Sequence, residues 1–234
     1  MASLFEPIKI KGLQLKNRIM MSSMCQYQAE NRDGKPTDWH LVHYTSRAVG
    51  GTGLIFVEMT DIEPRGRIRE QCLGLWSEEQ IPAYQRIIHS CHKYGAKVGL
   101  QVGHAGRKSE IQKVDLVAPS PIAYSETSRT PRELSILEIK RIIEGYGNSA
   151  NLAVKAGFDT VEIHAAHGYL IHQFISPMSN HRTDEYGDPA RMAIEVIQTV
   201  KSNIPSDMPL LLRISACEYD DGGYDFEHML SLIP

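Results

Sequence analysis

Five short, nearly continuous apolar runs divide the chain at fairly regular intervals. Strands with one face in water alternate apolar and polar residues, whereas continuous apolar runs are typical of strands covered on both faces, as in parallel sheets. We therefore predict five buried strands. They lie at 17–22, 53–59, 97–104, 160–166 and 209–215.

Helix signals lie between these runs. Capping residues, two of them in capping-box spacing, precede apolar residues that recur at helical spacing, and glycines follow several of these stretches. An aspartate followed by proline also favours the first turn of a helix. The predicted starts are Thr37–Asp38, Ser77, Ser135, Asp188–Pro189 and Asp225, and the predicted ends of the first three are Gly50–Gly51, Gly95 and Gly157.

A strand followed by a helix, repeated five times, predicts right-handed βαβ units and a parallel sheet, an α/β fold. No linker-like stretch interrupts the pattern, so residues 1–234 are expected to form a single domain. The longest connection, 105–134, follows the third predicted strand. Connections of this length inside a compact domain are usually functional lids.

Composition narrows the class of partner. The formal charge of the 234 residues is −3, with no basic stripe, so nucleic acid and anionic membrane are not expected as partners. There is no apolar run of transmembrane length and no signal-peptide core at the N-terminus. The four cysteines lack CxxC spacing, which favours a reducing, cytoplasmic environment.

Polar residues gather where the predicted strands end. The first run ends in "SSMCQY", the third in "QVGHAGRK", the fourth in "HAAHGY" and the fifth in "RISACEY". In parallel α/β folds, the carboxyl ends of the strands carry the chemistry. The simpler alternative is that each strand merely leaves the core into a polar loop.

Single residues also have simpler interpretations. Cys25 could be a small core residue, and Lys108 could be a surface charge. Arg213 interrupts an apolar run, and a buried arginine needs an anionic or carbonyl partner. Spacing alone would allow three histidines to bind zinc, although a zinc site needs a further ligand. These three are His164, His167 and His172, whereas His40, His43, His89 and His92 are expected on helix surfaces.

Four segments together resemble the old yellow enzyme family of FMN-dependent ene-reductases, and most of all its short bacterial branch of NADPH dehydrogenases. The resemblance extends from about residue 4 to about residue 226. It implies the family's (β/α)₈ TIM barrel, of which about five of the eight βα units are present. The segments are residues 4–27, 101–108, 162–187 and 210–216.

The resemblance also implies roles for the strand-end residues, with FMN as cofactor and NADPH as reductant. His164 and His167 would bind the carbonyl or nitro oxygen of the substrate, where charge develops during alkene reduction. Tyr169 would donate a proton to the α-carbon, and Tyr27 would line the substrate pocket. The implied flavin contacts are Ser22, Met24, Cys25, Met59, Gln101 and Arg213, with Lys108 nearby.

Cys25 would tune the flavin potential, and it joins Tyr169, His164 and His167 as a candidate catalytic residue. Met59 stands where this branch usually has a small residue, and the segment "EYGDPARM" is shorter than the family pattern. The branch also lends a C-terminal arginine to a neighbouring subunit, so a homo-oligomer is expected.

Because each βα unit needs about 30 residues, three units and the phosphate-binding loops after strands seven and eight are expected to lie outside this sequence. FMN phosphate binding by this chain is therefore in question. Two alternatives stay open: a non-catalytic barrel remnant that acts through self-association or complementation, and a metal-dependent barrel hydrolase. No metal is expected under the leading interpretation. A dienoyl-CoA reductase is disfavoured because its iron–sulfur cysteines are lacking.

Overall fold

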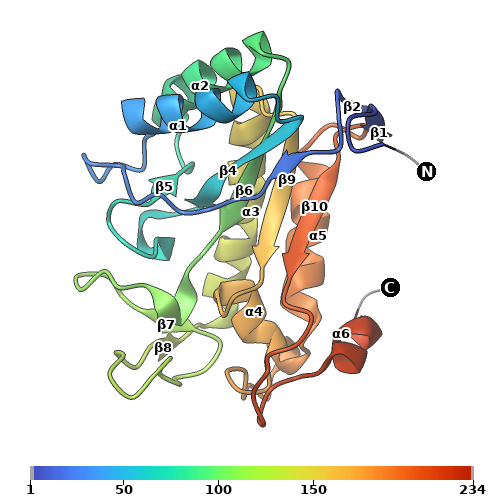
Figure 1. Cartoon of the computed structure of the whole chain (residues 1–234). Coiled ribbons are helices and arrows are strands. Elements are labelled where there is room, and N and C mark those ends of the chain that lie inside the picture. Colours follow the sequence, from blue (N-terminus) through green and yellow to red (C-terminus); the bar gives the residue numbers. More distant parts are fainter. Residues whose placement is uncertain (1–2, 233–234) are drawn as a thin grey trace.

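The computed structural model of the chain describes residues 3–232 and is built on one curled, parallel sheet (Figure 1). Its strands run in the order β10–β9–β6–β4–β3, and the short β5 pairs with β4 beyond this path. All of these pairs are parallel, as the continuous apolar runs predicted. The strands are β3 (Met20–Met21), β4 (Leu54–Asp61), β5 (Leu73–Gly74), β6 (Lys97–Gly103), β9 (Thr160–Ala165) and β10 (Leu210–Ile214).

The predicted helices follow the strands and cover one face of the sheet (Figure 1). Thr37 and Ser135 are N-caps, and Gly157 ends its helix at φ 96°, a left-handed conformation that glycine adopts without a steric penalty. The Asp225 side chain accepts the backbone N–H of His228. The predicted helices are α1 (Asp38–Val49), α2 (Ile81–Lys93), α3 (Ile136–Ala156), α5 (Arg191–Ser202) and α6 (Phe226–Leu232), and the short α4 (Leu170–Ile175) was not predicted.

The two faces of the sheet differ because successive side chains of a strand point in opposite directions. Valines, leucines and isoleucines at alternate positions of β6 and β9 pack against the helices in the main core. The intervening positions include Gln101, Glu162 and His164, which therefore share the opposite, inner face. A smaller apolar cluster, with Leu54 and Phe56 of β4, also lies on the inner face.

Short elements outside the βα pattern were not predicted. The chain begins with an antiparallel hairpin of β1 (Ile8–Ile10) and β2 (Leu13–Leu15). Short 3₁₀ turns interrupt the connections. They are η1 (Pro64–Gly66), η2 (Glu78–Gln80), η3 (Gly106–Lys108) and η4 (Glu185–Gly187).

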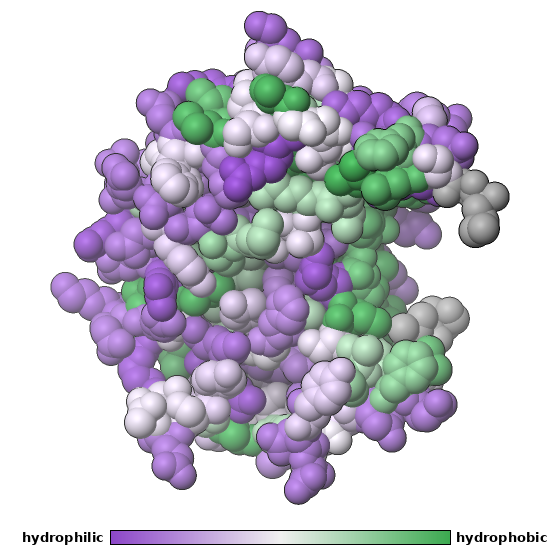
Figure 2. Space-filling view, in the orientation of Figure 1, coloured by the Kyte–Doolittle hydropathy of each residue, from purple (hydrophilic) through white to green (hydrophobic). Residues whose placement is uncertain are grey.

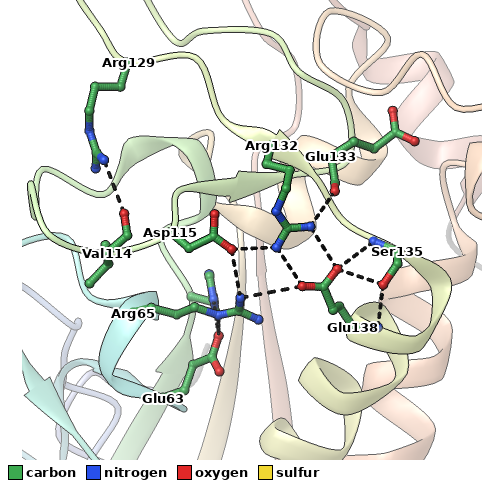
Figure 3. A network of polar contacts seen from close by, with 10 residues as sticks. Glu63, Arg65, Val114, Asp115, Arg129, Arg132, Glu133, Ser135 and Glu138 are labelled. Atoms are coloured by element: carbon green, nitrogen blue, oxygen red, sulfur yellow. Dashed lines mark hydrogen bonds and ion pairs between the residues drawn. The ribbon is translucent and has the colours of Figure 1, made fainter.

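The long 105–134 connection lies beyond the carboxyl end of β6. A network of ion pairs and hydrogen bonds between side chains holds it in place (Figure 3). Within it, β7 (Val117–Ala118) pairs with β8 (Arg132–Glu133). The Arg132 guanidinium donates to Asp115 at 2.6 Å and to Glu138 of α3 at 2.7 Å. Arg65 of η1 approaches the same two carboxylates. The connection is thus fastened to the first turn of α3 and to the segment after β4.

Three expectations need correction. The first strand covers only Met20–Met21 rather than 17–22. Helix α5 begins at Arg191, two residues after Pro189, because Asp188 closes a turn with the N–H of Ala190. His40 is fully buried rather than on the helix surface. It shares one face of α1 with Tyr44 and Ala48, and this face packs on β4.

The sheet does not close within residues 3–232, because β3 and β10 lie at its two ends. Met20 of β3 and the nearby Met24 are about half exposed. An apolar cavity of about 240 Å³ lies beside β10, between Leu212, Ile194 and Met229. Apolar residues accordingly reach the surface on the side of the molecule seen in Figure 2. None of the helices in the described range is long and apolar enough to cross a membrane.

Candidate active site at the strand ends

The turn after β9 brings three of the predicted residues together. His167 and Gly168 both have positive φ angles, 58° and 74°, which reverse the chain sharply before Tyr169 caps α4. The His164 ring lies 4.9 Å, centre to centre, from the rings of both His167 and Tyr169. Both contacts are close to perpendicular, so the three rings form one cluster at the carboxyl end of the strand.

Hydrogen bonding assigns the ring proton of His164. Its Nδ1 accepts the backbone N–H of Ala166 at 3.2 Å, so the proton of the neutral ring lies on Nε2. Burial, followed by the His167 ring and then by nearby groups that include Arg213 and Lys108, lowers the pKa of His164 to about 3. The pKa of His167 is also lowered, first by burial and then by Arg213 and Lys108. At neutral pH, both rings are therefore neutral hydrogen-bond donors.

Tyr169 and Cys25 are held in their protonated forms. Burial is the main cause that raises the pKa of the Tyr169 phenol, and it raises the pKa of the Cys25 thiol to about 12. The carboxyl groups of Glu58 and Asp61 add to the effect on Cys25. Cys25 is thus a neutral thiol rather than a thiolate nucleophile.

Tyr27 and Lys108 lie beside the ring cluster. Tyr27 has a positive φ of 54°, and the guanidinium carbon of Arg69 lies 4.7 Å from the centre of its ring. The Lys108 ammonium donates to the carbonyl of His167 at 3.1 Å and lies 5.1 Å from the centre of the Tyr169 ring. Lys108 therefore contacts both the turn and the phenol.

A polar chain crosses the inner face beside the ring cluster. Ser23 Oγ donates to Gln101, whose amide nitrogen donates to Glu162 at 2.6 Å. Arg213 Nε donates to the same Glu162 oxygen at 3.1 Å. Glu162 is the anionic partner that Arg213 requires, and it was not predicted from the sequence. The signal was available, because Glu162 and His164 share one face of a strand.

Met59 completes the floor of the site. It is buried with Ile68, Cys72 and Ala105, and Cys25, Tyr27 and Tyr169 pack against this cluster. Gly103 makes room for this arrangement. A Cβ at Gly103 would lie 2.8 Å from the Met59 side chain and 3.4 Å from that of His164.

These residues fit the ring of a flavin. An isoalloxazine ring needs an apolar surface on one side and hydrogen-bond partners along its pyrimidine edge. Met24 and Cys25 supply such a surface, while Gln101 and Arg213 converge at one place on the inner face. Within the described residues, the two terminal nitrogens of Arg213 have no protein partner, which leaves them for an acceptor such as a ring carbonyl.

The 105–134 connection adds a cavity of about 560 Å³ next to this site. Its lining includes Lys108 and Tyr124, and the Lys108 ammonium lies 4.5 Å from the centre of the Tyr124 ring. Lys108 thus links the cavity to Tyr169. Residues 3–232 contain no group of three or more His, Cys, Asp or Glu side chains that could hold a metal ion.

Comparison with known proteins shows the family to which the chain belongs. The model of the NADH:flavin oxidoreductase / NADH oxidase family matches residues 3–232. The chain belongs to this family. The relatives described as NADPH dehydrogenase include a Bacillus subtilis protein that is 49% identical over 226 residues, or 95% of the chain. The chain spans about two thirds (66%) of the length of that relative.

Solved structures of the family share the fold. The old yellow enzyme homologue from Zymomonas mobilis is 33% identical and superposes with a TM-score of 0.85, over 97% of this chain and 67% of that one. Morphinone reductase in complex with tetrahydroNAD is 30% identical, with a TM-score of 0.87, over 98% of this chain and 68% of that one. These likenesses confirm the expected old yellow enzyme relationship and the TIM-barrel class of the curled sheet.

Proposed function

We propose that the protein is an FMN-dependent NADPH oxidoreductase that reduces the C=C bond of α,β-unsaturated carbonyl or nitro compounds. The observation that carries the proposal is the cluster of neutral His164, His167 and protonated Tyr169 beside a surface that fits a flavin ring. The name of the Bacillus subtilis relative supports NADPH as the reductant, and the morphinone reductase complex supports a nicotinamide ligand at this fold.

Six residues would hold the cofactor ring. When bound, FMN would supply the hydride transfer from NADPH to the alkene. Arg213 would offset negative charge at the pyrimidine end, and the neutral Cys25 thiol would contact the ring and influence its potential. The proposed ring contacts are Ser22, Met24, Cys25, Met59, Gln101 and Arg213.

The histidine pair would bind the activating oxygen of the substrate. Negative charge develops on that oxygen as the alkene is reduced, and fixed donors stabilise such charge without reorganising. His164 is suited to this role because the bond from Ala166 directs its proton to Nε2. One donor of this kind contributes about 2.7–4 kcal/mol to transition-state stabilisation.

Tyr169 would donate the proton to the α-carbon. Its raised pKa keeps the phenol neutral and protonated over the physiological range, so a proton is always present for transfer. The neighbouring Lys108 ammonium favours the phenolate that is left after transfer. Tyr27 would line the substrate pocket.

The proposal is tested by supplying FMN and following NADPH oxidation with 2-cyclohexenone and with cyclohexanone. We expect NADPH to be consumed with 2-cyclohexenone but not with cyclohexanone. For His164→Ala, kcat/KM for the enone should fall about 100-fold or more, since each factor of ten corresponds to about 1.4 kcal/mol. His89→Ala, on the exposed side of α2, is the matched control. Enone reduction that survives unchanged in His164→Ala would refute the assigned role. No flavin band and large oligomers would favour the barrel remnant.

A further inference from the structure

His172 lies behind the catalytic turn and is not needed for any step above. It belongs to α4 and is buried, with a side chain only 8% exposed. Its Nδ1 accepts the backbone N–H of Gly168 at 2.7 Å, and its Nε2 lies 2.8 Å from the Tyr224 hydroxyl. The Tyr224 hydroxyl also lies 2.8 Å from the carbonyl oxygen of Ser215, to which it donates.

Only one arrangement of protons satisfies this chain of contacts. Because Nδ1 accepts from Gly168, the ring proton of neutral His172 must lie on Nε2. The Nε2–H then donates to the Tyr224 oxygen, and the hydrogen of Tyr224 goes to the Ser215 carbonyl. A protonated imidazole would place a second N–H directly against the N–H of Gly168.

The turn that His172 supports depends on such bonds. His167 has a left-handed backbone, a conformation that is sterically unfavourable for a non-glycine residue. The N–H of His167 donates to Ser215 Oγ at 3.1 Å, and the N–H of Gly168 donates to His172. Both amides that define the turn are therefore tied to the same chain, His172–Tyr224–Ser215, which connects β9 to the end of β10.

We propose that His172 is a positioning residue that, in its neutral Nε2–H form, fixes the His167–Gly168 turn and so sets the places of His167 and Tyr169, and that protonation of His172 releases the turn. This inference rests on the proposed function and adds a pH-sensitive support to its site. The groups that face His172 are Glu218, His167, Tyr224, Arg107 and Lys108.

These neighbours favour the neutral ring at physiological pH. Burial is the largest influence and lowers the pKa of His172, and His167, Arg107 and Lys108 act in the same direction. Glu218 opposes them from 3.5 Å. Its other oxygen already accepts from Ser176 and from the N–H of Tyr224, so these two donors share the carboxylate with His172. The turn is thus expected to be fixed at neutral pH and released in acid.

The direct test needs no cofactor. In NMR spectra of protein labelled with ¹⁵N, Nδ1 of His172 should be unprotonated and Nε2 should be protonated. The amide hydrogen of Gly168 should exchange slowly with solvent. On acidification, loss of the bare Nδ1 and faster exchange of Gly168 should occur together. Exchange that does not change as His172 titrates, or a proton on Nδ1 at neutral pH, would overturn the proposal.

The functional test uses phenol, whose oxygen would occupy the acceptor place between the histidines of the FMN-loaded protein. Wild-type affinity should fall by up to about tenfold for each pH unit below the pKa of His172, because only the neutral form is competent. His172→Asn keeps an acceptor for Gly168 without a titrating group, so this part of the pH profile should be lost. His172→Leu should weaken binding at all pH values, and His89→Asn is the control.

The two tests fail in distinguishable ways. If FMN or phenol does not bind the wild type, the proposed function fails, while the exchange of Gly168 still reports on His172. If phenol binds and His172→Asn keeps the wild-type pH profile, then the positioning role fails and the proposed function stands. If His172 had only a structural role, its replacement would change stability but would not change the pH profile of phenol binding.

Discussion

Replacing Glu63 by glutamine should lower the free energy of unfolding at neutral pH but not in acid. Glu63 accepts from His104 Nε2 at 2.9 Å and from Arg65, so it joins the end of β6 to the ion network that fastens the 105–134 connection (Figure 3). Burial alone would raise the pKa of its carboxyl group, but the bonds from His104 and Arg65 outweigh burial and lower the pKa from 4.5 to about 2.

This difference sets the magnitude and the sign of the effect. At about 1.4 kcal/mol for each pKa unit, it corresponds to about 3 kcal/mol of stability at neutral pH. Because the side chain is 31% exposed, solvent screening reduces the expected value to about 2 kcal/mol. A carboxyl group with a lowered folded pKa contributes fully above its unfolded pKa, about 4.3, and loses the contribution as pH falls toward 2.

The assay is urea unfolding of wild type, Glu63→Gln and the control Glu79→Gln, which removes an exposed charge on η2. We expect the first variant to lose about 2 kcal/mol of unfolding free energy at pH 7, with the difference shrinking from pH 5 to pH 3. An equal loss at pH 7 and pH 3 would show that the charge is not responsible. A loss matched by the control would refute the specific role of this network.

Three further outcomes are expected. Tyr169→Phe should slow alkene reduction while sparing flavin reduction by NADPH, which needs no proton from the phenol; equal loss in stopped-flow measurements of both steps would indicate a structural role. Glu162→Gln should weaken flavin binding about tenfold, because Gln101 and Arg213 lose a charged partner worth about 1.5–3 kcal/mol per hydrogen bond; an unchanged dissociation constant by fluorescence titration would contradict this. Riboflavin should bind a polypeptide of residues 1–234 within about tenfold of FMN, because the proposed contacts are all to the ring; strong selectivity for FMN would reveal a phosphate site within these residues.

Much of the fold could be predicted because the rules involved are local. The continuous apolar runs of β4, β6 and β9 predicted a parallel sheet, and Ser135 with Glu138 predicted the start of α3. These signals depend on neighbouring residues and on burial of whole strands. The first strand was predicted too long because only two of its residues pair with β4, and pairing depends on the partner strand.

Features formed between distant segments were not predictable in the same way. Glu162 was missed because its partners, Gln101 and Arg213, come from strands on either side of β9. His40 was placed on the surface because the sequence does not show which face of a helix meets Glu58, 3.2 Å from its Nε2. Its spacing with Tyr44 and Ala48 was the available clue. The roles of the strand-end residues were inferred from resemblance to a family, and binding and activity measurements on variants are needed to test them.

The central claim, that His164 and His167 form the oxygen-binding pair of a flavin site, is tested most directly by the dissociation constant of phenol for the FMN-loaded protein. The measurement compares wild type, His164→Ala, His167→Ala and the control His89→Ala, by absorbance titration at pH 7.5. We expect each site variant to bind phenol at least about tenfold more weakly, the cost of one lost hydrogen bond at about 1.4 kcal/mol per factor of ten, with the control unchanged. Phenol binding of wild-type strength in both site variants would contradict the account.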